Sequence, residues 1–223
     1  MPAQNSTGPK ISSGASTCWR ELLFWLLLVP ALKALGSDLP KRELAGVIEA
    51  CGFLFIAYAS LGKLRSLGLE FVEWNRVGRS AVAACTVAGL VAGGAIVEVA
   101  KLSNQPIGAG AGWNRVVLAI ALGPISEEVI FRGYLLNGAL WVARRLAGTR
   151  AVTLSIIGSA ALFSVAHLAT PGITGLQLGC ALMTGCLYGW IRMRYSSTAA
   201  AALTHGMYNF ALYLSCWTGL SHS

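Results

Sequence analysis

Charged side chains are scarce in this sequence, and their scarcity excludes an ordinary water-soluble domain. Only 12% of the 223 residues are Asp, Glu, Lys or Arg, whereas 55% are hydrophobic, and the mean hydropathy is +0.63. Soluble domains carry roughly 25% charged residues. Apolar runs of membrane length recur along the chain, and the short alternating segments of a membrane barrel are missing. The sequence therefore predicts an all-α, polytopic transmembrane bundle.

The sequence also has no closely paired cysteines, and it has few acidic residues, nine against 17 Lys and Arg. The six cysteines form no CxxC pair, and five lie inside predicted spans, which favours buried apolar side chains over a disulfide or metal framework. The net charge is +8. Because the basic residues stand in short loops between apolar runs, as the positive-inside rule places them, the charge does not indicate a nucleic-acid partner.

About seven spans are predicted, within one helical bundle. Residues 1–18 are polar and are expected to form a disordered tail. The part 19–112 is expected to hold the N-terminal membrane helices and an interfacial amphipathic segment at 63–76. The predicted spans are 22–35, 44–62, 80–100, 113–143, 151–169, 173–191 and 197–217, followed by a tail at 218–223. The first is the weakest because it contains Pro30 and Lys33, and an interfacial helix is its alternative.

Glycine and proline predict where spans pack or bend. Gly89 and Gly93 form a small-xxx-small pair, which favours close contact with another helix. The sixth span is rich in glycine, and we expect these glycines to serve packing rather than a substrate groove. Gly123-Pro124 predicts a kink in the fourth span, just before two acidic residues.

Those acidic residues, Glu127 and Glu128, lie with Arg132 between two apolar runs. Charged groups inside a membrane span are costly and by default mark function. Glu128 and Arg132 are four residues apart, so on a helix they share a face and can pair. Glu127 lies about 100° around the helix from Glu128. The spacing predicts one carboxylate tied to arginine and one left for chemistry; a purely structural ion pair is the alternative.

Two further spans carry polar residues at helical spacing. The fifth ends in Phe163-xxx-His167, and the seventh contains His205-xxx-Asn209, whose members share one face. The groups are predicted to meet at a similar depth, and His205 fits that depth least well. Peptide hydrolysis needs an activated water, a proton carrier and oxyanion donors, which a poorly solvated glutamate, a histidine and an amide can supply. Structural hydrogen bonds between helices are the alternative for the histidines and Asn209.

The three motifs occur in order, each on its own span: Glu127-Glu128-xxx-Arg132 with Phe131, Phe163-xxx-His167, and His205-xxx-Asn209. Together they resemble the motifs of the CPBP family, the CAAX-protease and bacteriocin-processing intramembrane glutamic endopeptidases. The resemblance covers 113–217, which implies a catalytic core with a CAAX-prenyl-endopeptidase-like fold. It also implies roles for the matching residues and no metal or organic cofactor. Glu127 would activate water with help from His167, His205 and Asn209 would stabilise the oxyanion, and Glu128, Arg132, Phe131 and Phe163 would support them.

The resemblance also implies a class of substrate: membrane-associated or C-terminally tagged proteins, such as those with a sorting tail or a prenylated tail. The expected location is a bacterial inner membrane. With the N-terminus inside, eleven Lys and Arg residues lie on the inner side and four on the outer side, which places the catalytic set nearer the outer face. A prenylated tail would instead approach from the cytosol.

Three other functions are open to the same residues. A zinc metalloprotease has possible ligands in Glu127, Glu128, His167 and His205, but the HExxH helix is missing. A proton-coupled transporter also uses embedded Glu and His, but no inverted repeat is visible. A non-catalytic scaffold or immunity protein would keep the fold without the chemistry. Glu127→Gln separates the enzyme from the scaffold, because it preserves shape and removes the base, and activity in excess chelator would exclude the metalloprotease.

Overall fold

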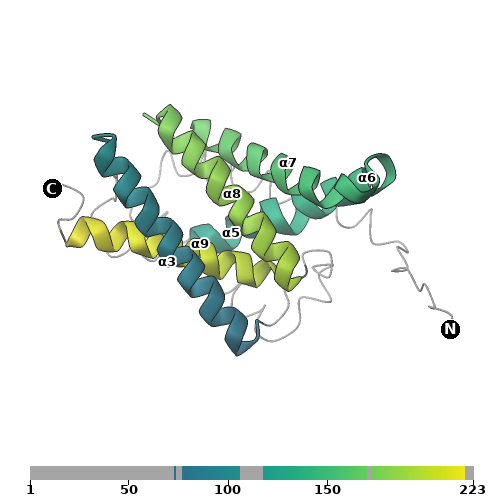
Figure 1. Ribbon diagram of the computed structural model, residues 1–223, viewed down its shortest axis with the longest axis horizontal. Coiled ribbons are helices and arrows are strands. Elements are labelled where there is room, and N and C mark those ends of the chain that lie inside the picture. Colours follow the sequence, from purple (N-terminus) through teal and green to yellow (C-terminus); the bar gives the residue numbers. More distant parts are fainter. Residues whose placement is uncertain (1–72, 74–76, 106–117, 170–171, 219–223) are drawn as a thin grey trace, which may run out of the picture.

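The structure, a computed structural model, describes residues 73, 77–105, 118–169 and 172–218, and within these ranges it is all-helical with no strand (Figure 1). In chain order the elements are α3 (Arg79–Leu102), η3 (Leu118–Leu122), α5 (Gly123–Glu128), η4 (Val129–Leu135), α6 (Leu136–Leu146), η5 (Gly148–Arg150), α7 (Ala151–Ala166), η6 (His167–Ala169), α8 (Gly175–Tyr195) and α9 (Thr198–Trp217). The predicted tails, the first two spans and most of the amphipathic segment lie outside the described residues. The all-α prediction is confirmed for the part that is described.

Two helical segments are long and apolar enough to cross a membrane, α3 and Gly148–Ala166. Both present large aliphatic side chains on their outer surfaces, among them Val87 and Val91 on α3 and Ile157 on α7. Exposed apolar side chains of this kind are suited to lipid contact. The total of about seven spans depends partly on segments outside the described residues, so it stays a prediction.

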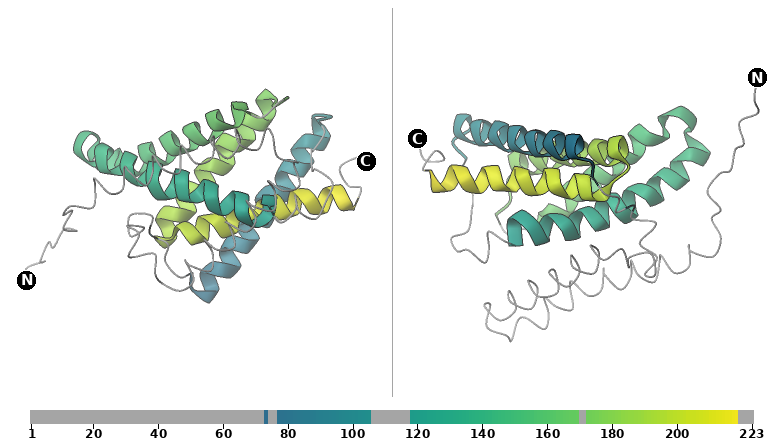
Figure 2. Two further views of the ribbon diagram at one scale, coloured as in Figure 1. Left: turned by 180° about the vertical axis from the view of Figure 1, so that it is seen from behind. Right: turned by 90° about the horizontal axis from the view of Figure 1, so that it is seen from below.

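Helices α3 and α9 cross in close contact, side by side in both views (Figures 1 and 2). Gly89 and Gly93 form the crossing point, and both are buried. A Cβ at Gly93 would lie 2.6 Å from the Ala211 Cβ and 2.7 Å from the Tyr208 carbonyl oxygen. No methyl group fits there, which confirms the packing predicted for this glycine pair.

Helices α6, α7 and α8 form the other side of the bundle, where α6 and α7 pack as a hairpin through η5 (Figure 2). A Cβ at Gly185 would lie 3.0 Å from the Ala160 Cβ, and one at Gly189 would lie 3.0 Å from Ile156. The expected packing role is thus confirmed for these two α8 glycines. Gly175 and Gly179, by contrast, face open space.

The fourth predicted span is helical from Leu118 to Leu146, but its winding changes three times. Wide π-helical turns, η3 and η4, flank the short α-helix α5 that carries the two glutamates. Pro124 lacks a backbone N–H and cannot complete a regular α-helical ladder. The irregularity expected at Gly123-Pro124 therefore takes the form of a π turn that ends at Leu122. Such turns often occur at functional sites.

Candidate active site

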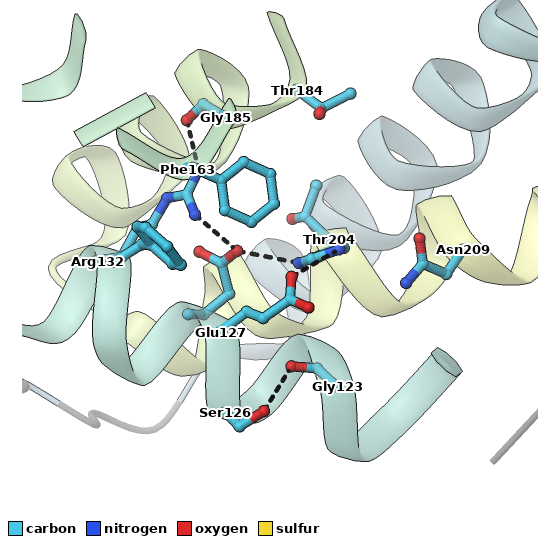
Figure 3. A network of polar contacts seen from close by, with 12 residues as sticks. Gly123, Ser126, Glu127, Arg132, Phe163, Thr184, Gly185, Thr204 and Asn209 are labelled. Carbon is cyan, nitrogen blue, oxygen red and sulfur yellow. Dashed lines mark hydrogen bonds and ion pairs between the residues drawn. The ribbon is translucent and has the colours of Figure 1, made fainter. Parts of the chain in front are cut away.

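Glu128 and Arg132 form an ion pair in the centre of the bundle, and both side chains are fully buried. Arg132 Nη1 donates to Glu128 Oε1 at 3.1 Å, and Nη2 donates to the carbonyl oxygen of Gly185 at 2.9 Å (Figure 3). The guanidinium also lies over the Phe163 ring, 4.4 Å from its centroid. Several partners are needed because hydrogen bonds from the protein must replace the water contacts that both charges lose on burial. The predicted pair is therefore present, and it joins η4 to α7 and α8.

His205 connects this ion pair to Glu127. Its Nδ1 lies 3.0 Å from Glu128 Oε1, and its Nε2 lies 3.9 Å from Glu127 Oε2 (Figure 3). A carboxylate only accepts hydrogen bonds, so Nδ1 carries a proton and Nε2 is directed toward Glu127. The contact between Glu128 and His205 spans 77 residues and was not predicted. Despite its expected poor fit in depth, His205 reaches both glutamates.

Glu127 and Glu128 have opposite environments although they are adjacent. The Glu128 side chain is 0% exposed, whereas that of Glu127 is 39% exposed. A tied carboxylate beside an accessible one is the arrangement that the helical spacing predicts. On the other side of α5, Ser126 donates to the Gly123 carbonyl oxygen at 2.9 Å.

His167 and Asn209 are each held by one backbone carbonyl. His167 Nδ1 donates to the Phe163 carbonyl oxygen at 2.8 Å, which leaves Nε2 available. Asn209 Nδ2 donates to the Ala119 carbonyl oxygen at 2.6 Å and so braces the π turn η3. An amide nitrogen has two N–H groups, so one remains for another acceptor. Within the described residues, the ion-pair contact of Glu127 is with His205 and none joins it to His167.

A cavity of about 290 Å³ brings the four predicted catalytic residues together, since Glu127, His167, His205 and Asn209 all line it. The volume is large enough for several water molecules, each of which occupies roughly 30 Å³ in the liquid. The supporting residues divide: Phe163 lines the cavity, whereas Phe131 packs edge-on against Phe163, with 5.1 Å between ring centroids. One carboxylate, two imidazoles and one amide therefore border a single space that is large enough for water.

The comparison with known protein families matches the part of the chain that carries the three motifs. Residues 109–211 match the family model described as Type II CAAX prenyl endopeptidase Rce1-like. Through this segment, the chain is similar to the Rce1-like family. The resemblance to the CPBP family is thereby confirmed, and with it the general description of a membrane protein that is a protease. The chain matches no curated protein and no solved structure.

The Rce1-like segment does not form the whole cavity. Helix α3 precedes it in sequence, yet Ile96, Val99 and Ala100 of α3 line the cavity. These residues had no assigned role because an aliphatic wall has the same sequence signal as any apolar span. Tyr188 of α8 also lines the cavity and was likewise missed, since only the folded chain places it beside His205.

Proposed function

We propose that this protein is an endopeptidase that hydrolyses membrane-associated or C-terminally tagged proteins with water activated by Glu127. The observation that carries the proposal is the contrast between the two glutamates. Glu128 Oε1 contacts both Arg132 and His205, and the whole side chain is excluded from solvent. Glu127 is accessible, lines the cavity and faces His205 Nε2. A general base must reach the water from which it takes a proton.

The proposed reaction begins with water between Glu127 and the substrate carbonyl. Glu127 takes one proton as the water oxygen attacks the carbonyl carbon, and the carbonyl oxygen becomes an oxyanion. His167, with its Nε2 available, can share the attacking water and relay the proton held by Glu127 to the leaving amine, which restores the Glu127 carboxylate. Cleavage of the C–N bond then releases an amine and a carboxylic acid, so the reaction consumes one water.

Oxyanion stabilisation is assigned to His205 and Asn209. His205 Nε2 can donate only when the ring carries two protons, because Nδ1 already donates to Glu128. The second N–H of Asn209 supplies another donor. Donors fixed in advance are effective because they need not reorganise as charge develops.

The substrate and location follow from the family and the charge pattern. The family description names CAAX prenyl endopeptidases. A protein with a prenylated tail is therefore one candidate substrate for this chain, and a protein with a sorting tail is the other. We place the protein in a bacterial inner membrane as a bundle of about seven spans, with residues 113–217 as its catalytic core. The distribution of basic loops supports a cavity nearer the outer face, and such a position would favour a membrane-anchored substrate with an exposed tail.

The test uses the purified full-length protein in detergent with quenched peptides and tailed membrane proteins. We expect cleavage by the wild type, a loss of at least about 100-fold with Glu127→Gln, and no change with Glu98→Gln. Glu98 is a suitable control because it is exposed on α3 and pairs only with Lys101 among the described residues.

Three outcomes would contradict the proposal. Equal cleavage by wild type and Glu127→Gln would remove Glu127 from the reaction. A biological effect of the protein that survives Glu127→Gln unchanged would favour a scaffold or immunity protein. Activity that disappears in excess chelator and returns with zinc would favour the metalloprotease.

A further inference from the structure

Tyr188 and His205 both line the cavity, and the tyrosine ring stacks on the imidazole. The two rings are nearly parallel, with 4.6 Å between centroids and 17° between planes. Tyr188 is fully buried, so its ring is held by the surrounding side chains. The stack therefore places a fixed aromatic face against one face of the imidazole.

The orientation of His205 depends on more than its hydrogen bond. The bond from Nδ1 to Glu128 fixes one ring atom at 3.0 Å, but it leaves the ring able to turn about that contact. Phe163 touches the imidazole edge-on, with 5.8 Å between centroids and 86° between planes. Tyr188 covers a face of the ring and thereby opposes this rotation. As a result, Nε2 stays directed toward Glu127.

The same tyrosine ring also contacts Arg132, whose guanidinium carbon lies 5.3 Å from its centroid. Tyr188 thus touches both partners of Glu128. An aromatic face attracts cations, so this ring suits an imidazolium as well as a guanidinium. The contact with two members of the polar set distinguishes Tyr188 from a tyrosine that only fills space between helices.

The ring rather than the hydroxyl carries these contacts. The hydroxyl lies near Thr184, but it makes no hydrogen bond of standard geometry within the part of the chain that the structure describes. Thr184 uses its own hydroxyl hydrogen on the Cys180 carbonyl oxygen at 2.8 Å. Tyr188→Phe therefore keeps the stack and loses no established hydrogen bond.

We propose that Tyr188 is a positioning residue whose ring sets the plane of the His205 imidazole, so that Nε2 faces Glu127 and the reacting carbonyl. This inference rests on the proposed function. It predicts an effect on the chemical step rather than on substrate binding, because the ring acts through His205.

The first experiment compares Tyr188→Leu, Tyr188→Phe and a control, Tyr134→Leu, in the full-length protein. Tyr134 is also a buried tyrosine, 3% exposed on η4, and it does not line the cavity. We expect Tyr188→Leu to lower kcat about tenfold or more with little change in KM, since small misplacements of catalytic groups can cost up to ~100-fold. Tyr188→Phe should stay within about twofold of wild type, because the stack is retained. Tyr134→Leu should lower thermal stability and keep kcat.

Two results would overturn the proposal. One is a kcat for Tyr188→Leu no lower than that for Tyr134→Leu, which would make the role purely structural. The other is an equal loss in Tyr188→Phe and Tyr188→Leu, which would assign the effect to the hydroxyl.

A second experiment asks whether Tyr188 acts through His205. Tyr188→Leu is introduced into a His205→Gln background, and the two fold-losses are compared. We expect a much smaller loss in that background, because the imidazole to be positioned is absent; equal losses would contradict the inference. If Glu127→Gln loses the wild-type activity and Tyr188→Leu keeps it, the positioning role of Tyr188 is wrong and the proposed function still stands. A structure of Tyr188→Leu gives a readout that does not depend on activity. We expect the His205 imidazole to be rotated in it, and an unchanged imidazole would contradict the inference.

Discussion

Glu127 and Glu128 are identical side chains on adjacent residues, and the fold gives them different surroundings. Glu128 is enclosed by Arg132 and His205, while Glu127 borders the cavity. The pairing of Glu128 with Arg132 could be predicted because both lie on one helix with a known period. The contact between Glu128 and His205 could not, because it depends on how α5 and α9 pack, which no local pattern specifies.

The burial of Glu128 leads to a prediction about stability. Glu128→Gln removes the charge that balances Arg132 in a fully buried position. Breaking a buried pair on one side typically costs about 3–5 kcal/mol, since the remaining charge stays desolvated. We expect Glu128→Gln to lower the free energy of unfolding in detergent by this order.

Glu127→Gln is the matched control for this measurement. The Glu127 side chain is 39% exposed, so its neutralisation should change stability by less than about 1 kcal/mol. Equal stability of the two variants would show that the Glu128 charge is not needed for folding.

At the scale of elements, the ends of the helices follow the sequence closely, and the exceptions have identifiable causes. The predicted spans 80–100 and 197–217 correspond to α3 and α9 with small differences at their ends. The sixth was predicted to end at residue 191, but α8 continues to Tyr195. Arg192 does not end the helix, because its guanidinium donates to Glu73 at 2.6 Å and Asn137 at 3.0 Å. The π turns beside α5 were not foreseen, since they depend on tertiary contacts such as the bond from Asn209.

The crossing of α3 and α9 gives a prediction with an adjacent control. Gly93→Ala would place a methyl group 2.6 Å from the Ala211 Cβ, and overpacking of this kind typically costs about 1–3 kcal/mol. Helix α3 would have to move away from α9, and with it the cavity wall formed by Ile96 and Val99. We expect lower thermal stability and lower cleavage activity together.

Gly94→Ala should have neither effect. A Cβ at Gly94 meets nothing within 4 Å, and alanine favours the helix by up to about 1 kcal/mol over glycine. Similar behaviour of the two variants in thermal unfolding would contradict the close contact at Gly93.

For the whole molecule, the scarcity of charge was sufficient to predict an all-α membrane bundle, and the match to the Rce1-like family agrees with it. The number of spans could not be established in the same way, because weak segments such as 22–35 have more than one physical solution. Glu73 is one point where the earlier part of the chain attaches to the described core. Its carbonyl oxygen accepts from the Thr198 backbone N–H at 3.0 Å, and its carboxylate pairs with Arg192.

This attachment predicts that Glu73→Gln destabilises the whole bundle modestly. Arg192 is 2% exposed and would keep Asn137 as a neutral partner, while the Glu73 side chain is 45% exposed. Because solvent screens that side of the pair, we expect a loss of about 1 kcal/mol in the free energy of unfolding. Glu98→Gln, in the exposed pair with Lys101, should change it by no more than about 0.5 kcal/mol. The reverse order would show that the attachment at Glu73 does not contribute to stability.

The position of α3 has a consequence for how such a protein can diversify. Its aliphatic residues border the same space as the reacting groups, yet they precede the stretch that defines the family. Under the proposed function, selectivity and chemistry would be encoded in separate lengths of chain. Mutations in α3 would then change which substrates are accepted while every motif residue is kept, so that related proteins with identical motifs need not share a substrate.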